Sequence, residues 1–425
     1  MSRRRNIMIG IMAAACAASL IACGGKNQAT GTEEQRQSSS EEQVELDMFF
    51  LKPENIDILE EIADDFTEEH PNVKITMQHG TKEQLLSRIA TNDIPDILQT
   101  WPSQTLFQNM MGEGLLMDLS EQECVTRMLE SIRESTKHED GKDYAVSVTI
   151  NSGAMFYNQG MFKELGIAEP ETLDDLWAAC ERLKEAGVTP FACPDKDVAA
   201  LGNVFDRFIG SNIDHEFYKF SEKVAAGEAS YKDHPDLRKY LEVYLRIREN
   251  TDGNSLGTSP DDMKNAFANG KAGFILGGTY DLSLVQSLNP ETEIGWMYFP
   301  EIVEGVEPWP CGSVDTAVSV SSGTKHPEEA LAFVEYFVSP EVAQKYADAD
   351  KNPNLIKGVK VDVPQFETLT KDIEDGKFAS MSANEWPPSL RNETAVYVQQ
   401  LIMDKDIEAF LENFDQVTRE CYQNQ

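Results

Sequence analysis

Strand patterns and helix patterns alternate along this chain, and that alternation limits the folds open to it. Residues 44–50 alternate in side-chain polarity as a strand does, and residues 73–77 form a second such segment. Residues 55–70 between them carry apolar side chains at helical spacing, namely Ile56, Leu59, Ile62, Ala63 and Phe66. A strand, a helix and a strand in this order predict an α/β fold in which helices cover a sheet on both faces.

The alternation continues through the rest of the chain. Thr172 is a predicted helix N-cap with Asp175 in the first turn, and Gly187 is placed to end that helix. With 425 residues, the chain is long enough for two lobes with separate cores. The other predicted segments are helices at 82–90, 106–111, 214–226, 235–250, 260–268 and from Pro327, strands at 96–99, 188–192, 272–276 and 294–299, and two helices within 394–421.

The N-terminal residues have the pattern of an export signal. Three arginines precede the almost uncharged residues 7–21, and small Ala22 directly precedes Cys23. This resembles the lipobox of bacterial lipoproteins, which implies a signal peptide at 1–22 and a lipid on Cys23. A retained membrane anchor would need about 20 apolar residues, more than this run offers, and a plain secreted protein leaves the polar residues 23–43 unexplained. That polar tract cannot bury enough surface to fold and predicts a disordered spacer.

Composition narrows the classes of partner. The formal net charge of -36 argues against binding to nucleic acid or to anionic lipid headgroups. It fits a soluble, self-repelling surface, with an acidic site for a cationic ligand as the alternative. The cysteines after Cys23 have neither metal-ligand nor CxxC spacing. We therefore expect isolated buried thiols, with a single disulfide between Cys180 and Cys193 left open.

The common enzyme motifs are absent from the sequence. It has no GxSxG, GxxxxGK[ST], HExxH or GxGxxG motif, and its histidines are scattered. Residues 348–359 resemble a calcium loop, but Pro353 stands where a glycine is needed and Val359 where a glutamate is needed. A catalytic carboxylate pair assembled by the fold stays open, because acidic residues are numerous. We expect no metal, no cofactor and no enzymatic activity.

Seven segments follow one another in an order that is typical of one family. They are ADDFTEEHPNVKITM (63–77), IPDILQTW (94–101), GEGLLMDLS (112–120), GKDYAVSVTINSGAMFYNQGMFKELGI (141–167), ETLDDLWAACERLKEAGVTPFAC (171–193), FANGKAGFILGGTYDL (267–282) and HPEEALAFVEYFVSPEVAQKY (326–346). In this order they resemble the extracellular solute-binding proteins of family 1, the maltose-binding-protein-like carbohydrate binders of ABC importers. The resemblance implies a type II periplasmic-binding-protein-like fold, with two hinged α/β lobes around a ligand cleft. Its expected lobes are residues 44–150 plus 312–339 and residues 151–311 plus 340–425.

The resemblance also implies a carbohydrate site. The apolar face of a sugar ring stacks on aromatic rings, while its hydroxyl groups need fixed donors and acceptors. Trp101 matches a region where the family places sugar contacts, and Tyr280 stands where many relatives have tryptophan. The polar candidates lie at predicted strand ends or in loops, and Gly312 would let backbone approach the ligand. The predicted ligand-binding residues are Phe50, Lys52, Trp101, Asn151, Asp206, Tyr280, Asp281, Trp309, Gly312, Asp315 and Trp386.

These observations lead to one expected function and three alternatives. We expect a monomeric lipoprotein, tethered by Cys23 outside the bacterial cytoplasmic membrane, that captures a mono- or oligosaccharide. It would deliver this ligand to a membrane permease with a cytoplasmic ATPase and would not bind nucleic acid. The alternatives are a surface carbohydrate-processing enzyme, the same fold with a polyamine, peptide or metal chelate as ligand, and a sensory or adhesive lipoprotein.

Overall fold

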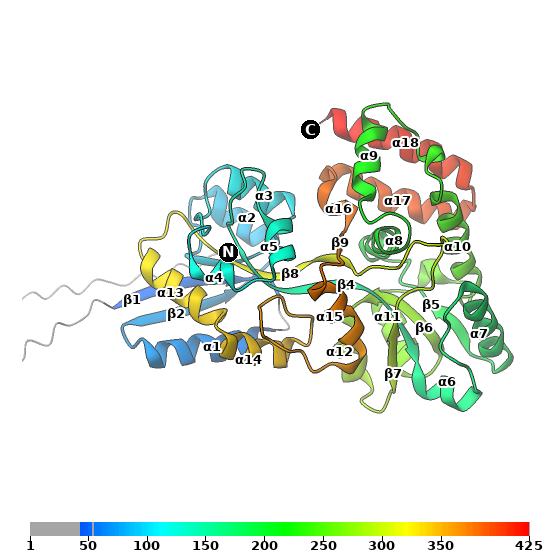
Figure 1. The fold of residues 1–425 in the computed structure, drawn as a ribbon, viewed down its shortest axis with the longest axis horizontal. Coiled ribbons are helices and arrows are strands. Elements are labelled where there is room, and N and C mark those ends of the chain that lie inside the picture. The colour runs from blue at the N-terminus through cyan, green and yellow to red at the C-terminus, as the bar shows by residue number, and fades with distance from the viewer. Residues whose placement is uncertain (1–42, 53–54, 425) are drawn as a thin grey trace, which may run out of the picture. The chain divides into compact units, whose positions relative to one another are not determined.

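The computed structural model describes residues 43–52 and 55–424. Its strands are hydrogen-bonded in the order β2-β1-β3-β8-β4-β6-β5, with β7 paired to β4 and β9 paired to β8 (Figure 1). β2-β1-β3 and β6-β5 are parallel groups, and the pairs between them are antiparallel. The strands are β1 (Val44–Phe50), β2 (Val73–His79), β3 (Ile97–Thr100), β4 (Val146–Asn158), β5 (Thr189–Ala192), β6 (Ala272–Gly278), β7 (Ile294–Met297), β8 (Cys311–Val320) and β9 (Ala379–Ser380).

The strands β4 and β8 connect the two parallel groups. Residues 146–152 of β4 pair with β8, and residues 153–158 of the same strand pair with β6 and β7. β8 in turn pairs with β3 through residues 317–320. Both strands are almost wholly buried, so their side chains and backbone are fixed on both faces. This arrangement places residues near the middle of β4 and β8 between the ends of β1, β3 and β6.

The helices around β1, β2 and β3 each bury one apolar face. In α1, Leu59, Ile62 and Phe66 are buried, as the helical spacing of the sequence predicts. α2 begins with a capping box, in which the side chains of Thr81 and Gln84 each accept from the other's backbone N–H. The helices of this group are α1 (Ile56–Glu69), α2 (Lys82–Ala90), α3 (Thr105–Gly112), α4 (Glu123–Thr126), α5 (Glu130–Thr136), α13 (Pro327–Phe337) and α14 (Pro340–Asp350).

The packing of helix α14 does not agree with the lobe boundary predicted at residue 340. The sequence assigned this segment to the second lobe, but Val342, Ala343 and Tyr346 lie in the same core cluster as Phe50 and Leu59. Pro340 opens the helix directly after α13, so the apolar face of α14 packs against α1 and α13. The core thus groups residues 340–350 with the first lobe; the rest of the predicted division stays a prediction.

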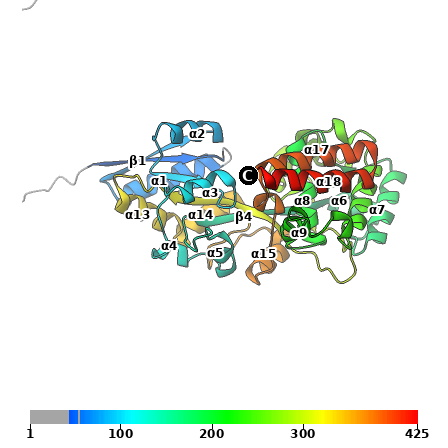
Figure 2. The same cartoon turned by 90° about the horizontal axis from the view of Figure 1, so that it is seen from above.

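Of the remaining helices, α6, α7, α8, α11 and α12 pack on the strands β4 to β7, and most of the others pack on helices. α7 begins at the predicted N-cap Thr172, which forms a capping box with Asp175. α17 and α18 lie side by side in both views, and α17 also packs on α8 (Figures 1 and 2). These helices are α6 (Gln159–Leu165), α7 (Leu173–Glu185), α8 (Val198–Asn212), α9 (Phe217–Ala225), α10 (Leu237–Glu249), α11 (Pro260–Ala268), α12 (Asp281–Leu288), α15 (Glu367–Glu374), α16 (Ser382–Glu385), α17 (Pro388–Asp404) and α18 (Ile407–Gln423).

The cysteines of the described part of the chain are free and buried, as the spacing predicts. Burial raises the pKa of Cys124, Cys180 and Cys193 to about 12, so these thiols stay protonated and unreactive at neutral pH. Among the described helices, none is both long enough and apolar enough to span a bilayer. The predicted signal peptide and Cys23 lie outside the described residues.

Candidate ligand-binding site

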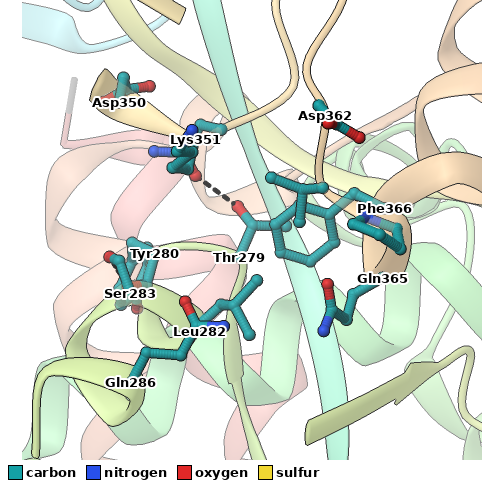
Figure 3. A pocket seen from close by; sticks show the side chains of 13 residues that line it. Thr279, Tyr280, Leu282, Ser283, Gln286, Asp350, Lys351, Asp362, Gln365 and Phe366 are labelled. Carbon is teal, nitrogen blue, oxygen red and sulfur yellow. Dashed lines mark hydrogen bonds between the residues drawn. The ribbon is translucent and has the colours of Figure 1, made fainter. Parts of the chain in front are cut away.

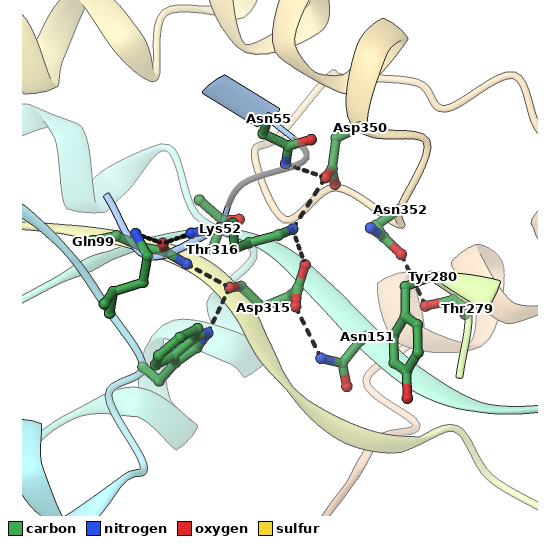
Figure 4. A network of polar contacts seen from close by, with 12 residues as sticks. Lys52, Asn55, Gln99, Asn151, Thr279, Tyr280, Asp315, Thr316, Asp350 and Asn352 are labelled. Atoms are coloured by element: carbon green, nitrogen blue, oxygen red, sulfur yellow. Dashed lines mark hydrogen bonds and ion pairs between the residues drawn. The ribbon is translucent and has the colours of Figure 1, made fainter. Parts of the chain in front are cut away.

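Asp315 on β8 holds the polar network at the junction of the strands (Figure 4). Its carboxylate forms an ion pair with Lys52, which follows β1. The Lys52 ammonium also lies 3.2 Å from Asp350, and Asp350 accepts from Asn55 Nδ2 at 2.6 Å. Burial alone would lower the pKa of Lys52, but the two carboxylates outweigh it and the pKa is raised well above its usual value. Lys52 is 6% exposed, so its role is to neutralise and position these carboxylates.

Side chains from β3 and the residues after it bind the backbone of Asp315. Trp101 donates its Nε1–H to the Asp315 carbonyl at 2.7 Å, and Gln99 donates to the same oxygen at 3.1 Å. The side-chain oxygen Oε1 of Gln99 accepts from the backbone N–H groups of Leu51 and Lys52. These bonds fix the orientation of the half-exposed Trp101 ring relative to the ends of β1 and β3.

A second chain of contacts runs from Asp315 toward β6. Asn151 Nδ2 donates to the Asp315 carboxylate at 3.1 Å, and Arg207 on α8 donates to Asn151 Oδ1 at 2.7 Å. The Arg207 guanidinium lies over the Tyr280 ring, 5.6 Å from its centroid. Tyr280 is 36% exposed, and Arg207 supports its ring from the buried side. Two accessible aromatic rings, Trp101 and Tyr280, are therefore joined through a continuous polar chain.

Three cavities lie near these residues, of which the third is lined by Tyr280 and the first by Lys82, the residue that lies over the Trp101 ring. One of about 320 Å³ has Lys82 and Gln104 on one side and Asn384 and Arg391 on the other. A neighbouring cavity of about 300 Å³ shares Arg391 with it and extends to α8. The third, about 160 Å³, lies beside Tyr280 and α12 (Figure 3). We call the first of these the Lys82–Arg391 cavity.

Several predicted ligand residues have structural roles instead. Phe50 is fully buried in the core of β1 to β3, because the last residues of β1 point inward. Asp281 is buried and accepts from the Gly278 backbone N–H at 3.0 Å at the start of α12. A Cβ on Gly312 would lie 1.8 Å from the Asn151 carbonyl oxygen, so this glycine is required by strand packing rather than by a ligand.

Three further predicted residues lie around α8. Trp309 stacks on His215 with ring centroids 4.0 Å apart, so its ring packs against another side chain of the protein. Asp206 is buried, accepts from the Ala383 backbone N–H at 2.9 Å, and burial raises its pKa to about 6. Trp386 is 3% exposed, but its indole N–H has no partner among the described residues and it lines the Lys82–Arg391 cavity. Of these three, Trp386 stays closest to the predicted role.

Four residues of the site were not predicted: Gln99, Lys82, Arg207 and Arg391. Gln99 belongs to a fully buried strand, where an amide needs a partner, and that burial pattern is the signal that could have found it. The oxygens of the calcium-loop-like segment serve protein contacts, since Asn352 accepts from Thr279 at 3.0 Å. In the part of the chain that the structure describes, no group of three or more metal-ligating side chains is assembled.

A sheet with two long connecting strands, polar and aromatic side chains at their junction, and adjoining cavities is the architecture of a ligand-binding protein. Comparison with known proteins identifies the group. The family model of the bacterial extracellular solute-binding proteins matches residues 52–344 of the chain. This chain therefore belongs to the bacterial extracellular solute-binding protein family, whose members are the binding components of ABC transporters and not enzymes.

Individual relatives agree with this family. The chain is 30% identical over 337 residues to a multiple sugar-binding protein of Streptococcus mutans, covering 76% of this chain and 78% of that protein. It is 22% identical to the melibiose/raffinose/stachyose-binding protein MelE of Bacillus subtilis, with 72% of each chain covered. Among solved structures, apo RafE of Streptococcus pneumoniae matches with a TM-score of 0.76 at 25% identity, covering 91% of this chain and 99% of that one. RafE in complex with raffinose matches with a TM-score of 0.74 and 25% identity, over 89% and 99%.

Proposed function

We propose that this protein captures an oligosaccharide between Trp101 and Tyr280 and delivers it to the permease of an ABC importer. The observation that carries the proposal is the pair of accessible aromatic rings joined by Asp315, Asn151 and Arg207. Rings of this kind stack on the apolar faces of sugars, and the intervening amide and guanidinium groups bind hydroxyls. The sugar ligands named for the relatives support the same class of ligand.

Ligand capture would close the two lobes around the sugar. A ligand shifts such an equilibrium only through different contacts in the two states, so it must touch both lobes. Trp101 belongs to the first predicted lobe, while Arg207 and Tyr280 belong to the second, and this division supports the proposal. Lipid on Cys23 and a spacer of about 20 residues would keep the loaded protein at high effective concentration beside its permease.

Isothermal titration calorimetry against a panel of neutral and acidic oligosaccharides tests the proposal. We expect saturable binding of at least one oligosaccharide by the native protein, with weaker binding by Trp101→Ala and Tyr280→Ala. The matched control is Tyr218→Ala, because Tyr218 is a half-buried ring on α9 that lines none of the three cavities. A fully buried ring such as Phe107 would not serve, since its removal would disturb the core. Binding of polyamines or peptides with no sugar in the panel would contradict the carbohydrate assignment.

Two further parts of the proposal have their own tests. Anchoring at Cys23 predicts a lipid-modified protein in the membrane fraction of the source cells, and mass spectrometry should find no such lipid on the Cys23→Ser variant. The alternative of a carbohydrate-processing enzyme predicts that a bound sugar is cleaved by the pure protein. Chromatography of the sugar recovered after prolonged incubation decides this, since an importer's binding protein returns it unchanged.

A further inference from the structure

The Lys82–Arg391 cavity carries positive charge in a strongly acidic protein. Lys82 lies at the start of α2 and Arg391 in the first turns of α17, so the two cations reach the cavity from separate helices. No aspartate or glutamate is among the described residues that line it. The chain as a whole has 73 acidic residues against 37 lysines and arginines, so an acid-free cavity with two cations is not what its composition would give.

Neither cation is neutralised by an ion pair within the described part of the chain. Lys82 donates to the Gln104 side-chain carbonyl and lies 5.1 Å from the Trp101 ring centroid. Arg391 donates to Asn203 Oδ1 at 3.1 Å, which uses one of its five N–H groups. Desolvation by the surrounding protein and the positive charge of Arg391 both lower the pKa of Lys82, the direction expected for two cations that share a cavity.

Two uncharged residues of the cavity wall also carry donors without an acceptor. The indole N–H of Trp386 and the Nδ2 amide of Asn384 are buried and have no hydrogen-bond partner among the described residues. Leaving a buried donor unpaired costs about 1 to 3 kcal/mol, so an acceptor supplied by a bound ligand or water would stabilise these groups. α17 begins at this wall with Pro388 and has no side-chain cap, so its N-terminal dipole adds to the positive potential.

Lys52 provides a contrast, because the protein itself neutralises its charge. It is buried and paired with two carboxylates, whereas Lys82 and Arg391 face a cavity with none. Asp206 lines the neighbouring cavity with Arg391 and attracts it electrostatically, but the two form no direct ion pair and Asp206 does not line the Lys82–Arg391 cavity. Two cations and two unpaired donors around one cavity call for a ligand rich in acceptors and negative in charge.

We propose that the Lys82–Arg391 cavity binds the carboxylate of an acidic sugar, so that the preferred ligand is an oligosaccharide containing uronic acid. The proposal rests on the proposed function and specifies its ligand class. A carboxylate presents two oxygens in one plane, which matches the paired N–H groups of a guanidinium. The Trp101 ring does not line this cavity, but it lies against Lys82, which does, so it would stack on the same or the next sugar unit.

Calorimetry with trigalacturonate and raffinose, a charged and a neutral trisaccharide, tests the ligand class. We expect trigalacturonate to bind at least about tenfold more tightly than raffinose, because charge-assisted hydrogen bonds add to the stacking contacts. Its affinity should fall as NaCl is raised, while that of raffinose should not. Binding of raffinose without trigalacturonate would overturn this inference and leave the proposed function standing; binding of no oligosaccharide would remove both.

If both trisaccharides bind, variants of the two cations test whether the cavity recognises the carboxylate. Lys82→Gln and Arg391→Gln should each weaken trigalacturonate about tenfold and change raffinose by less than about threefold. Arg391→Lys keeps the charge but loses the planar pair of donors, and we expect an intermediate loss. Lys239→Gln, an exposed lysine on α10, is the matched control for a change of one charge unit. Equal losses for both sugars, or none, would overturn the proposal. Lys82 is exposed on its helix, so its variant folds regardless of the outcome for Arg391.

Discussion

Replacing Lys52 by methionine tests whether the buried ion cluster holds the site together. Methionine keeps most of the side-chain volume and removes the ammonium group that lies between Asp315 and Asp350. The side chains of these two aspartates are 13% and 1% exposed, so water cannot replace the lost cation. Asn55 and Asn151 would still donate to them, but neither carries charge.

The expected cost is large because two carboxylates stay buried without a counterion. Removing one partner of a buried ion pair typically costs about 3 to 5 kcal/mol, and here the remaining negative charges also repel each other. The pKa of Lys52 is raised in the folded protein, so its contribution is complete below the usual lysine pKa of about 10.4 and is lost only as pH rises beyond it. The difference between the native protein and Lys52→Met should therefore be constant through neutral pH.

Urea unfolding followed by tryptophan fluorescence measures this difference. Lys74→Met is the matched control, because Lys74 pairs with Glu45 on the surface, where the two side chains are 61% and 63% exposed. Exposed pairs of this kind contribute little, so we expect no measurable change for the control. The double variant Lys52→Met/Asp315→Asn should recover part of the loss, since it removes one of the unpaired charges. The reasoning is wrong if Lys52→Met is no less stable than Lys74→Met.

Three further predictions concern the rings, a buried acid and the strand junction. Trp101→Ala and Tyr280→Ala should each weaken the bound sugar by about tenfold in calorimetry, with Trp101→Phe recovering part of the loss. Burial raises the pKa of Asp206 to about 6, so the folded protein holds a proton that the unfolded chain releases near pH 4. The free energy of unfolding should therefore fall by roughly 2 to 3 kcal/mol as the pH rises from about 4 to about 6. Urea titrations in that interval should show Asp206→Asn without this slope. Gly312→Ala should cost more than about 3 kcal/mol or prevent folding, because its Cβ would lie 1.8 Å from the Asn151 carbonyl oxygen; circular dichroism after expression checks this.

The fold was predictable where side-chain periodicity is strong. α1, α7 and α11 match their predicted segments closely, because each has a clear apolar face and α7 and α11 begin with a capping box. α8 was missed, since it is buried along nearly its whole second half and has no polar face there to set a helical period. The long β4 was missed for the same reason, as a strand buried on both faces shows no alternation.

The site was predictable only in part because its residues meet through long-range contacts. Lys52 and Asp315 were both predicted, but their pairing across 263 positions of sequence was not. Phe50 ends β1 and Asp281 begins α12 shortly after β6, yet the direction of the side chain at such a position decides between core and cavity, and the sequence pattern does not fix that direction. Arg391 is part of the site because α17 turns its first residues toward α2, which only the packing of α17 on α8 and α18 determines.

The network around Asp315 also shows how one residue of β8 connects Trp101 with Tyr280. Its backbone carbonyl accepts from Trp101, and its carboxylate accepts from Asn151, which in turn orients Arg207 under Tyr280. Hydrogen bonds in such a chain polarise one another, so a change at one ring alters the bonds that hold the other. Because Lys52 fixes the Asp315 carboxylate within buried structure, this coupling does not depend on a mobile surface charge.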